Sequence, residues 1–466
     1  MDKTGKTAGR TTALVITAMS AFLTPLSLAT VNVALPSIGK EFSMNAISLS
    51  WVAMAYIVSA AVFLVPLGRL ADIYGMKKIF LIGTCVFTLS SFFMGMAHTA
   101  LILIVYRVVQ GIGAAMLFGT GVAILSHVFP IEERGKVLGI NVASVYLGLS
   151  FGPFIGGILT QHLGWRSIFF LNVPLGVFII VSTLWKLKGE WADSRGEKFD
   201  LIGSFIYTAM IFAIMYGFSH LTTVSGVVII IAGFAGAILF IYQEGRTAMP
   251  ILNIELFKSN RAFALSNIAA LINYSATFAV GFLLSLYLQY IKGLSPQAAG
   301  FVLVSQPIIQ AAFSPLAGRV SDKVEPRIVA STGMALSALG LFLFVFVNET
   351  TPLWFIVISL VILGFGFAFF SSPNVNAIMS SVERRFYGIA SSVLATMRLL
   401  GQTFSMSTVM LFFLLYIGKV EILPAHYPYF LKSVRAAFVF FGVLCVAGIF
   451  ASLSRGKVRR NSEIEK

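Results

Sequence analysis

The sequence predicts an all-α membrane protein with 14 transmembrane helices, and three observations indicate this fold class. Of its 466 residues, 58% are hydrophobic and only 11% are charged, and the mean hydropathy of +0.91 lies well outside the range of soluble globular domains. Apolar runs of roughly 20 residues, each long enough to cross about 30 Å of hydrocarbon as a helix, recur along the whole chain. No run alternates like a transmembrane strand, which argues against a barrel.

Fourteen apolar runs are long enough to be transmembrane helices. We expect them near residues 12–35, 49–68, 78–98, 101–125, 136–160, 167–187, 200–220, 225–243, 262–290, 297–318, 328–347, 353–372, 386–416 and 434–454. The first run is too long for the apolar core of a signal peptide, and no obvious small-residue cleavage site follows it. We therefore expect it to remain as a helix.

The basic residues are distributed asymmetrically between the two sides of the expected helix array. Of the 33 Lys and Arg residues, 25 fall in the two tails and in the loops on the N-terminal side, whereas five fall in the opposite loops. This asymmetry predicts a cell-membrane protein with both termini in the cytoplasm. The net charge of +15 then sets the topology and meets anionic lipid headgroups, and it does not indicate a nucleic-acid site.

An internal repeat divides the chain. The stretch GRLADIYGMKK at residues 68–78 shares its Gly-Arg-x-x-Asp core with GRVSDKVEPR at residues 318–327. The separation of 250 residues between Asp72 and Asp322 exceeds one six-helix unit by about the length of the helix pair at 200–243. We therefore expect a six-helix bundle in residues 1–190, two inserted helices with flanking loops in 191–255, and a second six-helix bundle in 256–466.

The sequence gives no support for an enzyme. No phosphate-binding loop of the GxxxxGKS or GxxxxGKT type and no paired pocket carboxylates occur, which argues against ATP-driven pumping. The five histidines lie near span ends without the spacing of metal ligands, so we expect no metal or cofactor. Cys85 and Cys445 lie inside apolar spans, where packing thiols are expected.

Five stretches together resemble the major facilitator superfamily. GRLADIYGMKK resembles its cytoplasmic signature, RVVQGIGAA at 107–115 is similar to its helix 4 motif, and GLSFGPFIGGIL at 148–159 resembles the helix 5 motif of its antiporters. ATVNVALPSI at 29–38 and WRSIFFLNVPLG at 165–176 resemble segments of its 14-helix drug/proton antiporter branch. The resemblance covers the whole chain and implies two six-helix bundles that export amphiphilic small molecules by alternating access, coupled to protons and as a monomer.

The resemblance also implies a conformational latch in the 68–78 stretch. Glycines there let two helix ends approach and turn tightly, and the resemblance places the Asp72 carboxylate against the start of the helix at 386, where free amide N–H groups favour an anion. The alternative is a simple turn with solvated charges. The expected latch residues are Gly68, Arg69, Asp72, Gly75, Lys77 and, from the second copy, Asp322.

The fifth span carries a stripe of small residues. Gly148, Gly152 and Gly156 recur every four residues, with Pro153 and Gly157 beside them. Such a stripe permits close contact between membrane helices, and the proline removes a backbone donor. One interpretation is static packing; the other, which the resemblance supports, is a hinge or sealing contact that prevents leak during alternating access.

We expect a central cavity whose lining is neutral to positive. Arg107 and Arg398 lie within spans, each with a glutamine about one turn further on, and an intramembrane arginine is a functional candidate by default. Snorkelling of Arg107 and structural hydrogen bonding of Arg398 are the alternatives. The expected cavity residues are Asn32, Tyr56, Arg107, Gln110, Asn141, Tyr146, Asn273, Tyr274, Gln306, Arg398 and Gln402, with Tyr287, Gln310, Asn374 and Asn376 as further candidates.

The chain departs from the drug antiporters at one position. These proteins commonly carry an acid about nine residues before the proline of the NVALP segment, where this chain has Ser27, and none of its 18 Asp and Glu residues lies in the middle of an expected span. A buried carboxylate is the usual means of binding both a proton and a cationic drug. We therefore expect anionic or neutral amphiphiles to bind better than permanent cations, and a lipid or organic-anion transporter, including an importer, remains an alternative beside a scaffold without transport.

Overall fold

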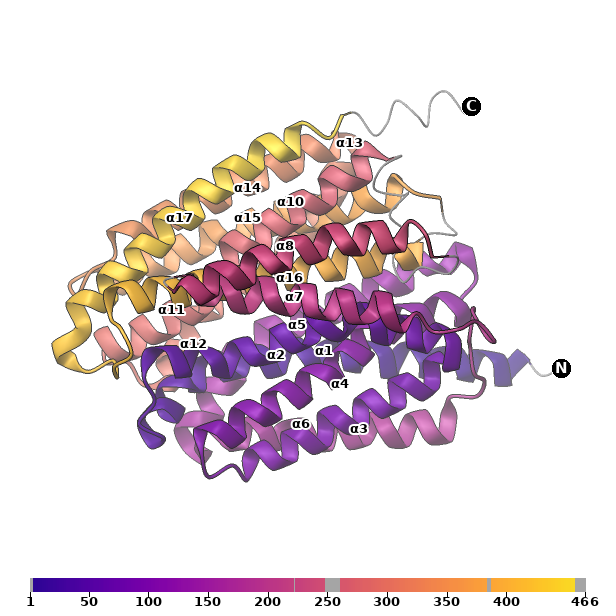
Figure 1. Cartoon of the computed structure of the whole chain (residues 1–466), viewed down its shortest axis with the longest axis horizontal. Coiled ribbons are helices and arrows are strands. Elements are labelled where there is room, and N and C mark those ends of the chain that lie inside the picture. Colours follow the sequence, from indigo (N-terminus) through magenta and orange to yellow (C-terminus); the bar gives the residue numbers. More distant parts are fainter. Residues whose placement is uncertain (1–2, 222, 248–259, 384–386, 457–466) are drawn as a thin grey trace.

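The computed structural model describes residues 3–221, 223–247, 260–383 and 387–456 (Figure 1). Every regular element within these residues is a helix, and together they provide 14 spans that are long and apolar enough to cross a membrane. The predicted all-α fold with 14 transmembrane helices is therefore confirmed. The predicted boundaries after residues 190 and 255 remain predictions.

The first bundle contains six helices. They are α1 (Lys3–Glu41), α2 (Ala46–Tyr74), α3 (Met76–Gly95), α4 (Ala100–Val128), α5 (Ile131–Leu163) and α6 (Ser167–Lys186). Side-chain caps mark two of the starts, because Asn45 accepts from the Ser48 amide ahead of α2 and Thr99 accepts from the Ile102 amide ahead of α4. Within the bundle α1 packs on α5, and α4 packs on both α2 and α3.

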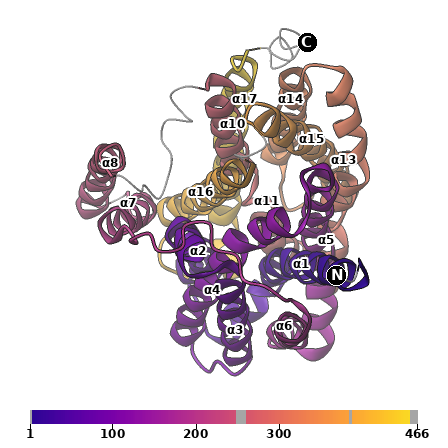
Figure 2. The ribbon, with the colours of Figure 1, turned by 90° about the vertical axis from the view of Figure 1, so that its right-hand side faces the viewer.

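Two inserted helices stand beside the bundles. α7 (Leu201–Ser219) and α8 (Val224–Glu244) form a hairpin, and Figure 2 shows them on the flank of the molecule. α7 contacts α2 of the first bundle and α16 of the second. Tyr207 of α7 donates a hydrogen bond to the Ala61 carbonyl, and the ring of Phe218 lies 4.5 Å from that of Phe404. One inserted helix therefore spans the seam between the bundles.

The second bundle contains six spans, several of them built from two or three pieces. They are α10 (Arg261–Thr277) with α11 (Val280–Leu286) and the π-helical η1 (Tyr287–Ile291); α12 (Pro296–Leu303) with α13 (Ser305–Lys323); α14 (Pro326–Leu343) with the 3-10 turn η2 (Phe344–Phe346); α15 (Leu353–Ser380); α16 (Tyr387–Tyr416); and η4 (Pro424–His426) with α17 (Tyr427–Leu453). α10 packs on α16 and α17, and α15 packs on α13 and α14.

Several expected helices differ from those observed, and the helices expected over 12–35 and 353–372 are longer, as Lys3–Glu41 and Leu353–Ser380. The span expected over 262–290 is interrupted after Thr277, where the Ser405 hydroxyl accepts the Ala279 amide. The span expected over 297–318 breaks at Val304, because Pro307 cannot donate to the preceding turn. The last span begins at Tyr427 instead of 434, preceded by the short η4 turn.

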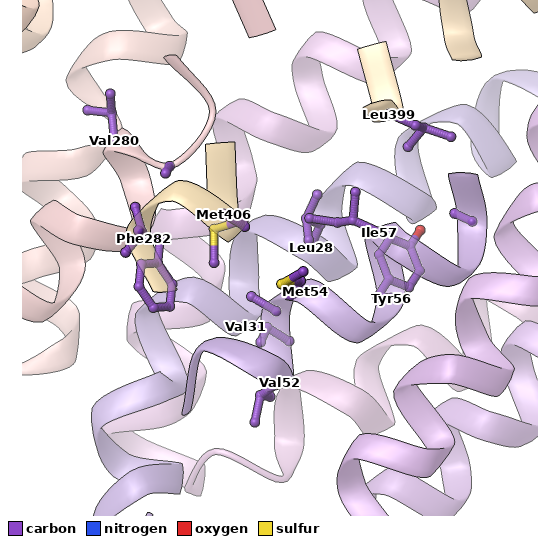
Figure 3. Close-up of a cluster of buried hydrophobic side chains, with 14 of the residues drawn as sticks. Leu28, Val31, Val52, Met54, Tyr56, Ile57, Val280, Phe282, Leu399 and Met406 are labelled. Atoms are coloured by element: carbon purple, nitrogen blue, oxygen red, sulfur yellow. The ribbon is translucent and has the colours of Figure 1, made fainter. Parts of the chain in front are cut away.

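Both ends of the described chain lie at the same end of the molecule (Figure 1), which we call the terminal side. At the opposite side the two bundles are in close contact. The Ser285 hydroxyl donates to the Asn32 carbonyl at 2.6 Å, and the Gln289 amide donates to the Val33 carbonyl at 2.9 Å. One buried apolar cluster joins Val31 of the first bundle to Phe282 of the second (Figure 3). The structure is therefore sealed on the side away from the termini.

Candidate functional site

A cavity of about 150 Å³ lies between the two bundles, lined by residues of α1, α2, α4 and α5 and of α10 to α13, α15 and α16. Apolar and aromatic side chains such as Leu28, Phe118 and Phe278 form much of the lining; Leu28, Tyr56 and Leu399 of this lining are labelled in Figure 3. Its polar lining residues are Thr24, Asn32, Tyr56, Tyr146, Tyr274, Thr277, Gln306, Gln310, Arg398 and Gln402. Arg398 is the single charged residue among the described lining residues, so this central cavity suits a partly apolar ligand that can accept hydrogen bonds.

A second cavity of about 140 Å³ continues from the first toward the terminal side. Its lining includes Asn141, Ser371, Ser391 and Ser392, which lie near the terminal-side ends of their helices. No described Asp or Glu lines either cavity. The two cavities together mark a path from the middle of the molecule toward the terminal side.

Eight of the 11 main cavity residues expected from the sequence line one of the two cavities. Seven line the central cavity, namely Asn32, Tyr56, Tyr146, Tyr274, Gln306, Arg398 and Gln402. Asn141 lines the second cavity. Arg107, Gln110 and Asn273 are fully buried and line neither. Of the further candidates Gln310 lines the central cavity, whereas Tyr287, Asn374 and Asn376 do not.

Arg107 lies inside the first bundle because its partners are there. Its Nε donates to the Val52 carbonyl at 2.9 Å, its Nη1 donates to Gln110 Oε1 at 2.6 Å, and its guanidinium lies 4.6 Å from the centre of the Tyr56 ring. The Gln110 amide donates in turn to the hydroxyls of Ser91 and Ser27. Arg107 therefore takes part in helix packing, and the expectation that it lines the cavity is wrong for this conformation.

Ser27 also faces the interior of the first bundle. Its hydroxyl accepts hydrogen bonds from Gln110 and from Asn172, each at 3.2 Å. The position where related drug antiporters carry an acid therefore contacts α4 and α6 here, and Ser27 lines neither cavity. Asn273 faces the interior of the second bundle, where its side-chain oxygen and nitrogen lack hydrogen-bond partners among the described residues.

Arg455, which was expected in the C-terminal tail, is buried at the end of α17. Arg455 is 2% exposed and donates to Asn374 Oδ1 at 2.6 Å and to the Ser266 hydroxyl at 3.3 Å. Burial lowers the pKa of Arg455 to about 10. This residue ties α17 to α10 and α15, which explains why Asn374 does not line the cavity. Its position just beyond an apolar span gave no signal of burial.

The 68–78 stretch is held by residues 187–200, which connect α6 to α7 and which we call the linker. The Met76 amide donates to the Trp191 carbonyl at 2.8 Å, and the Ser194 amide donates to the Asp72 carbonyl at 3.0 Å. Lys77 donates through its Nζ to the Leu187 carbonyl at 2.6 Å. These bonds lay the linker across the turn between α2 and α3.

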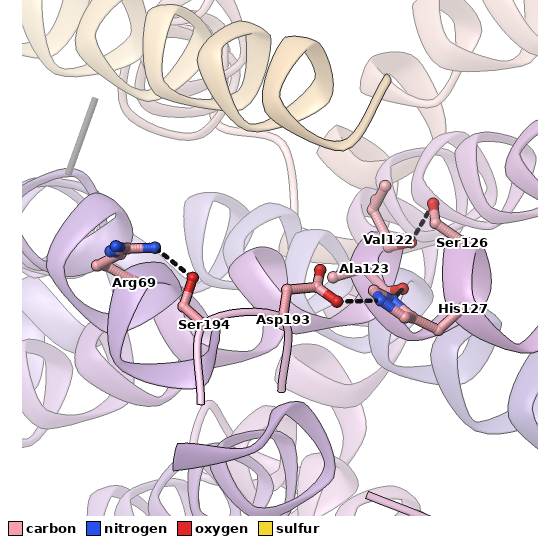
Figure 4. Close-up of polar contacts among 7 residues, drawn as sticks. All are labelled: Arg69, Val122, Ala123, Ser126, His127, Asp193 and Ser194. Carbon is pink, nitrogen blue, oxygen red and sulfur yellow. Dashed lines mark hydrogen bonds and ion pairs between the residues drawn. The ribbon is translucent and has the colours of Figure 1, made fainter. Parts of the chain in front are cut away.

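Side chains add to this attachment. Arg69 donates to the Ser194 hydroxyl at 2.7 Å and forms an ion pair with Glu197. His127 at the end of α4 contacts Asp193 at 2.7 Å (Figure 4). The expected contact of Asp72 with the start of the helix at 386 falls on residues 384–389, which lie outside the described side chains, as does the side chain of Asp322. The acidic residues spaced along the linker were the signal in the sequence that it contacts the basic 68–78 stretch.

The two expected latch glycines of the stretch differ in their surroundings. Gly75 has φ +117°, and a Cβ there would lie 2.5 Å from the Glu190 carboxyl group. A Cβ on Gly68 would meet no atom within 4 Å, whereas a Cβ on Gly119 of α4 would lie 3.2 Å from the Gly68 Cα. The close approach of α4 to α2 at this point therefore depends on Gly119, and Gly75 is the glycine of the stretch that its surroundings require.

The glycines of α5 face two different partners. A Cβ on Gly148 would lie 2.3 Å from the Phe22 carbonyl oxygen, and one on Gly152 would lie 2.3 Å from Ala29 Cβ, so this stripe packs on α1 in the same bundle. Gly156 meets Thr30 in the same way. Gly157 instead faces α12, with a Cβ placed 2.7 Å from the Pro296 carbonyl oxygen.

Pro153 lies at this second contact as well. A Cβ added to Gly300 of α12 would lie 2.3 Å from the Pro153 carbonyl oxygen. The backbones of α5 and α12 are therefore in direct contact across the two bundles. Static packing accounts for the stripe on α1, whereas Pro153 and Gly157 lie where the bundles meet.

Comparison with known proteins identifies the family. A family model described as the Major Facilitator Superfamily matches residues 17–249 and 267–466. The chain belongs to this superfamily. This superfamily member is 32% identical over 388 residues to the riboflavin transporter RibZ of Clostridioides difficile (strain 630), covering 83% of the chain and 84% of the relative.

Further relatives are named for drug resistance. The chain is 30% identical over 397 residues to the multidrug resistance protein Stp of Mycobacterium tuberculosis (strain ATCC 25618 / H37Rv), covering 84% of the chain and 73% of the relative. It is 28% identical over 400 residues to the methylenomycin A resistance protein of Bacillus subtilis (strain 168), covering 83% and 84%.

Solved structures share the fold. A bacterial homolog of the human lysosomal transporter Spinster superposes with a TM-score of 0.67 at 15% identity, over 99% of each chain. The nucleoside transporter NupG superposes with a TM-score of 0.64 at 14% identity, over 96% of this chain and 100% of that one. These structures share the fold, and the family match together with the 14 candidate spans shows that the chain is a multi-pass membrane transporter.

Proposed function

We propose that this transporter exports amphiphilic small molecules through the central cavity by alternating access. The observation that carries the proposal is the cavity itself, which lies between two bundles that are sealed on one side and is lined by aromatic rings and side-chain amides. Such surfaces accommodate amphiphiles of varied shape. The drug-resistance relatives support export, and we extend the proposal to a monomer in the cell membrane with the terminal side in the cytoplasm, as the basic residues indicate.

The lining also bears on substrate charge. Arg398 makes no hydrogen bond or ion pair with any described residue, and its guanidinium lies 5.7 Å from the centre of the Phe118 ring. Arg398 is half-buried in a largely apolar lining that contains no described carboxylate, so a ligand that brings negative charge or hydrogen-bond acceptors stabilises the occupied state. We therefore propose that anionic and neutral amphiphiles are the preferred substrates. The riboflavin transporter among the relatives supports a polar aromatic class.

The same observation favours a second candidate, an organic-anion transporter that works as an importer. Proton coupling is part of the first proposal because the sequence motifs resemble those of antiporters. No described carboxylate lines either cavity. A side chain that carries the coupled proton would therefore have to lie outside both cavities. The response of transport to an imposed pH gradient separates the two candidates.

Transport by purified protein in liposomes tests the proposal. Ethidium, fluorescein and riboflavin serve as cationic, anionic and neutral probes, each with and without an imposed pH gradient. We expect fluorescein and riboflavin to be carried faster than ethidium, and a pH gradient to accelerate their movement against the proton flow. Transport that ignores the pH gradient would favour the second candidate. Absence of transport for all three probes would contradict both.

A further inference from the structure

The two cavities meet at a ring of shared residues, which we call the divide. It consists of Thr24, Phe118, Val145, Tyr146, Tyr274 and Arg398, all of which line both cavities. Phe118 and Tyr146 come from α4 and α5 of the first bundle, whereas Tyr274 and Arg398 come from α10 and α16 of the second. The divide is therefore built from both bundles, where the two cavities adjoin on the path toward the terminal side.

Two contacts cross the divide from one bundle to the other. The Tyr146 hydroxyl shares a hydrogen bond with the Ser371 hydroxyl of α15. The Arg398 guanidinium faces the Phe118 ring at 5.7 Å, within the range of a cation–π contact. These two side-chain pairs link the bundles at the divide, beside the hydrogen bond from the Ser150 hydroxyl of α5 to the Pro307 carbonyl of α13.

Each cavity alone is too small for a drug-sized ligand. Each cavity, at about 150 Å³ and about 140 Å³, is smaller than the roughly 300–1,000 Å³ of typical ligand pockets. A drug-sized ligand therefore needs space from both cavities, or a rearrangement of the divide between them. Binding and opening are then coupled.

We propose that the divide is a thin gate on the terminal side, and that an anionic group on the substrate opens it by drawing Arg398 away from Phe118. The proposal rests on the proposed function, because it assumes that substrates pass through these cavities. Arg398 has no competing hydrogen bond or ion pair among the described residues. A carboxylate offers it a charge-assisted hydrogen bond, which is stronger than a contact with a ring. A permanent cation offers no such exchange.

Accessibility of the central cavity tests the gate. Cys85 and Cys445 are replaced by alanine, and Asn32→Cys, which lines only the central cavity, reports the rate of reaction with N-ethylmaleimide, an uncharged reagent. Since the opposite side is sealed, the reagent has to pass the divide. Tyr146→Phe and Ser371→Ala should each raise the rate about two- to tenfold, because each removes the hydrogen bond that crosses the divide.

Ser144→Ala is the matched control. This hydroxyl lies on the same helix as Tyr146, donates only to the Ile140 carbonyl of its own helix, and lines neither cavity. It should leave the reaction rate unchanged. Rates in Tyr146→Phe and Ser371→Ala that equal the rate in Ser144→Ala, with all three proteins folded by thermal unfolding, would overturn the gate.

Binding of fluorescein tests the role of the anion. If the anion opens the gate, reciprocity requires that weakening the gate by Ser371→Ala tightens fluorescein binding, by at most the factor seen in the reaction rate, and that it tightens tetraphenylphosphonium binding less. An unchanged fluorescein affinity, or equal gains for both ions, would overturn opening by the anion. The reaction rate and the binding affinity are both measured without transport. Failure to carry amphiphiles in liposomes would therefore overturn the proposed function without contradicting the gate.

Discussion

Arg107 and Arg398 both lie within membrane helices, yet their surroundings differ. Arg107 is fully buried between α2 and α4 and donates to the Val52 carbonyl and to Gln110. Arg398 lies between two cavities and makes no hydrogen bond with a described residue. The first arginine thus stabilises packing within a bundle, and the second is available to a ligand.

We expect Arg107→Leu to lower stability and leave ligand preference unchanged. The substitution leaves the Val52 carbonyl and the Gln110 oxygen without their donor, which costs about 1–3 kcal/mol for each buried polar group that stays unpaired. Thermal unfolding of the purified protein measures the loss. A protein of normal stability whose fluorescein affinity has dropped would show instead that Arg107 reaches the ligand.

Arg398→Gln should have the opposite effect. Stability should change little, because the arginine has no described hydrogen-bond partner to lose. Fluorescein affinity should fall about tenfold to a hundredfold, the loss expected for one charge-assisted hydrogen bond, whereas riboflavin affinity should fall less. Equilibrium binding to the purified protein measures both. Equal effects on anions and on tetraphenylphosphonium, or tightest binding by a quaternary cation in the wild type, would contradict a positive cavity.

At the scale of elements, the linker is the clearest addition to what the sequence predicted. Its backbone bonds to Asp72 and Met76, and its acids pair with Arg69 and His127. Because the linker continues directly into α7, which contacts both bundles, the turn between α2 and α3 is connected to the seam between the bundles.

Arg69→Ala should loosen the linker. Hydrogen exchange of the Ser194 amide should accelerate about threefold to tenfold, because the substitution removes an ion pair and a hydrogen bond that are partly exposed to solvent. Lys78→Ala, an exposed change in the same stretch, is the control and should leave exchange unchanged. Identical exchange in both variants would show that the backbone bonds alone hold the linker.

Gly152→Leu should separate α5 from α1. A Cβ at this position already lies 2.3 Å from Ala29 Cβ, so the helices have to move apart, and Ala29 lines the central cavity. We expect transport in liposomes to be lost or to become a leak. Gly139→Leu makes the same change on the same helix in open space, and it should transport normally. Normal coupled transport by Gly152→Leu would contradict the tight contact.

Helix number and order were predictable because hydrocarbon thickness sets the length of each apolar run. The break at Thr277 was not predictable, because the Ser405 hydroxyl that accepts the Ala279 amide comes from another helix, whereas Pro307 was a signal in the sequence for the break at Val304. Seven expected cavity residues line the central cavity because polar side chains within a span avoid lipid. Arg107 and Asn273 also avoid lipid, but they do so inside a bundle. Helix periodicity cannot distinguish the interior of a bundle from the space between two bundles.

At the scale of the whole molecule, the two bundles meet on the side away from the termini, and the cavities lead toward the terminal side. Transport requires this arrangement to reverse. The contacts that must open are those between α5 and α12 and those between α1 and α11, whereas the stripe on α1 stays within one bundle. The seam that α7 covers has to accommodate the same motion.

The most direct measurement of the central claim is transport by the Asn32→Cys protein, in the background without Cys85 and Cys445, before and after reaction with a bulky maleimide. Asn32 lines the central cavity, so the attached group should fill the proposed route. We predict that fluorescein transport in liposomes falls to the level of protein-free vesicles after the reaction, and that bound fluorescein slows the reaction itself. Unchanged transport by fully labelled protein would contradict a route through this cavity.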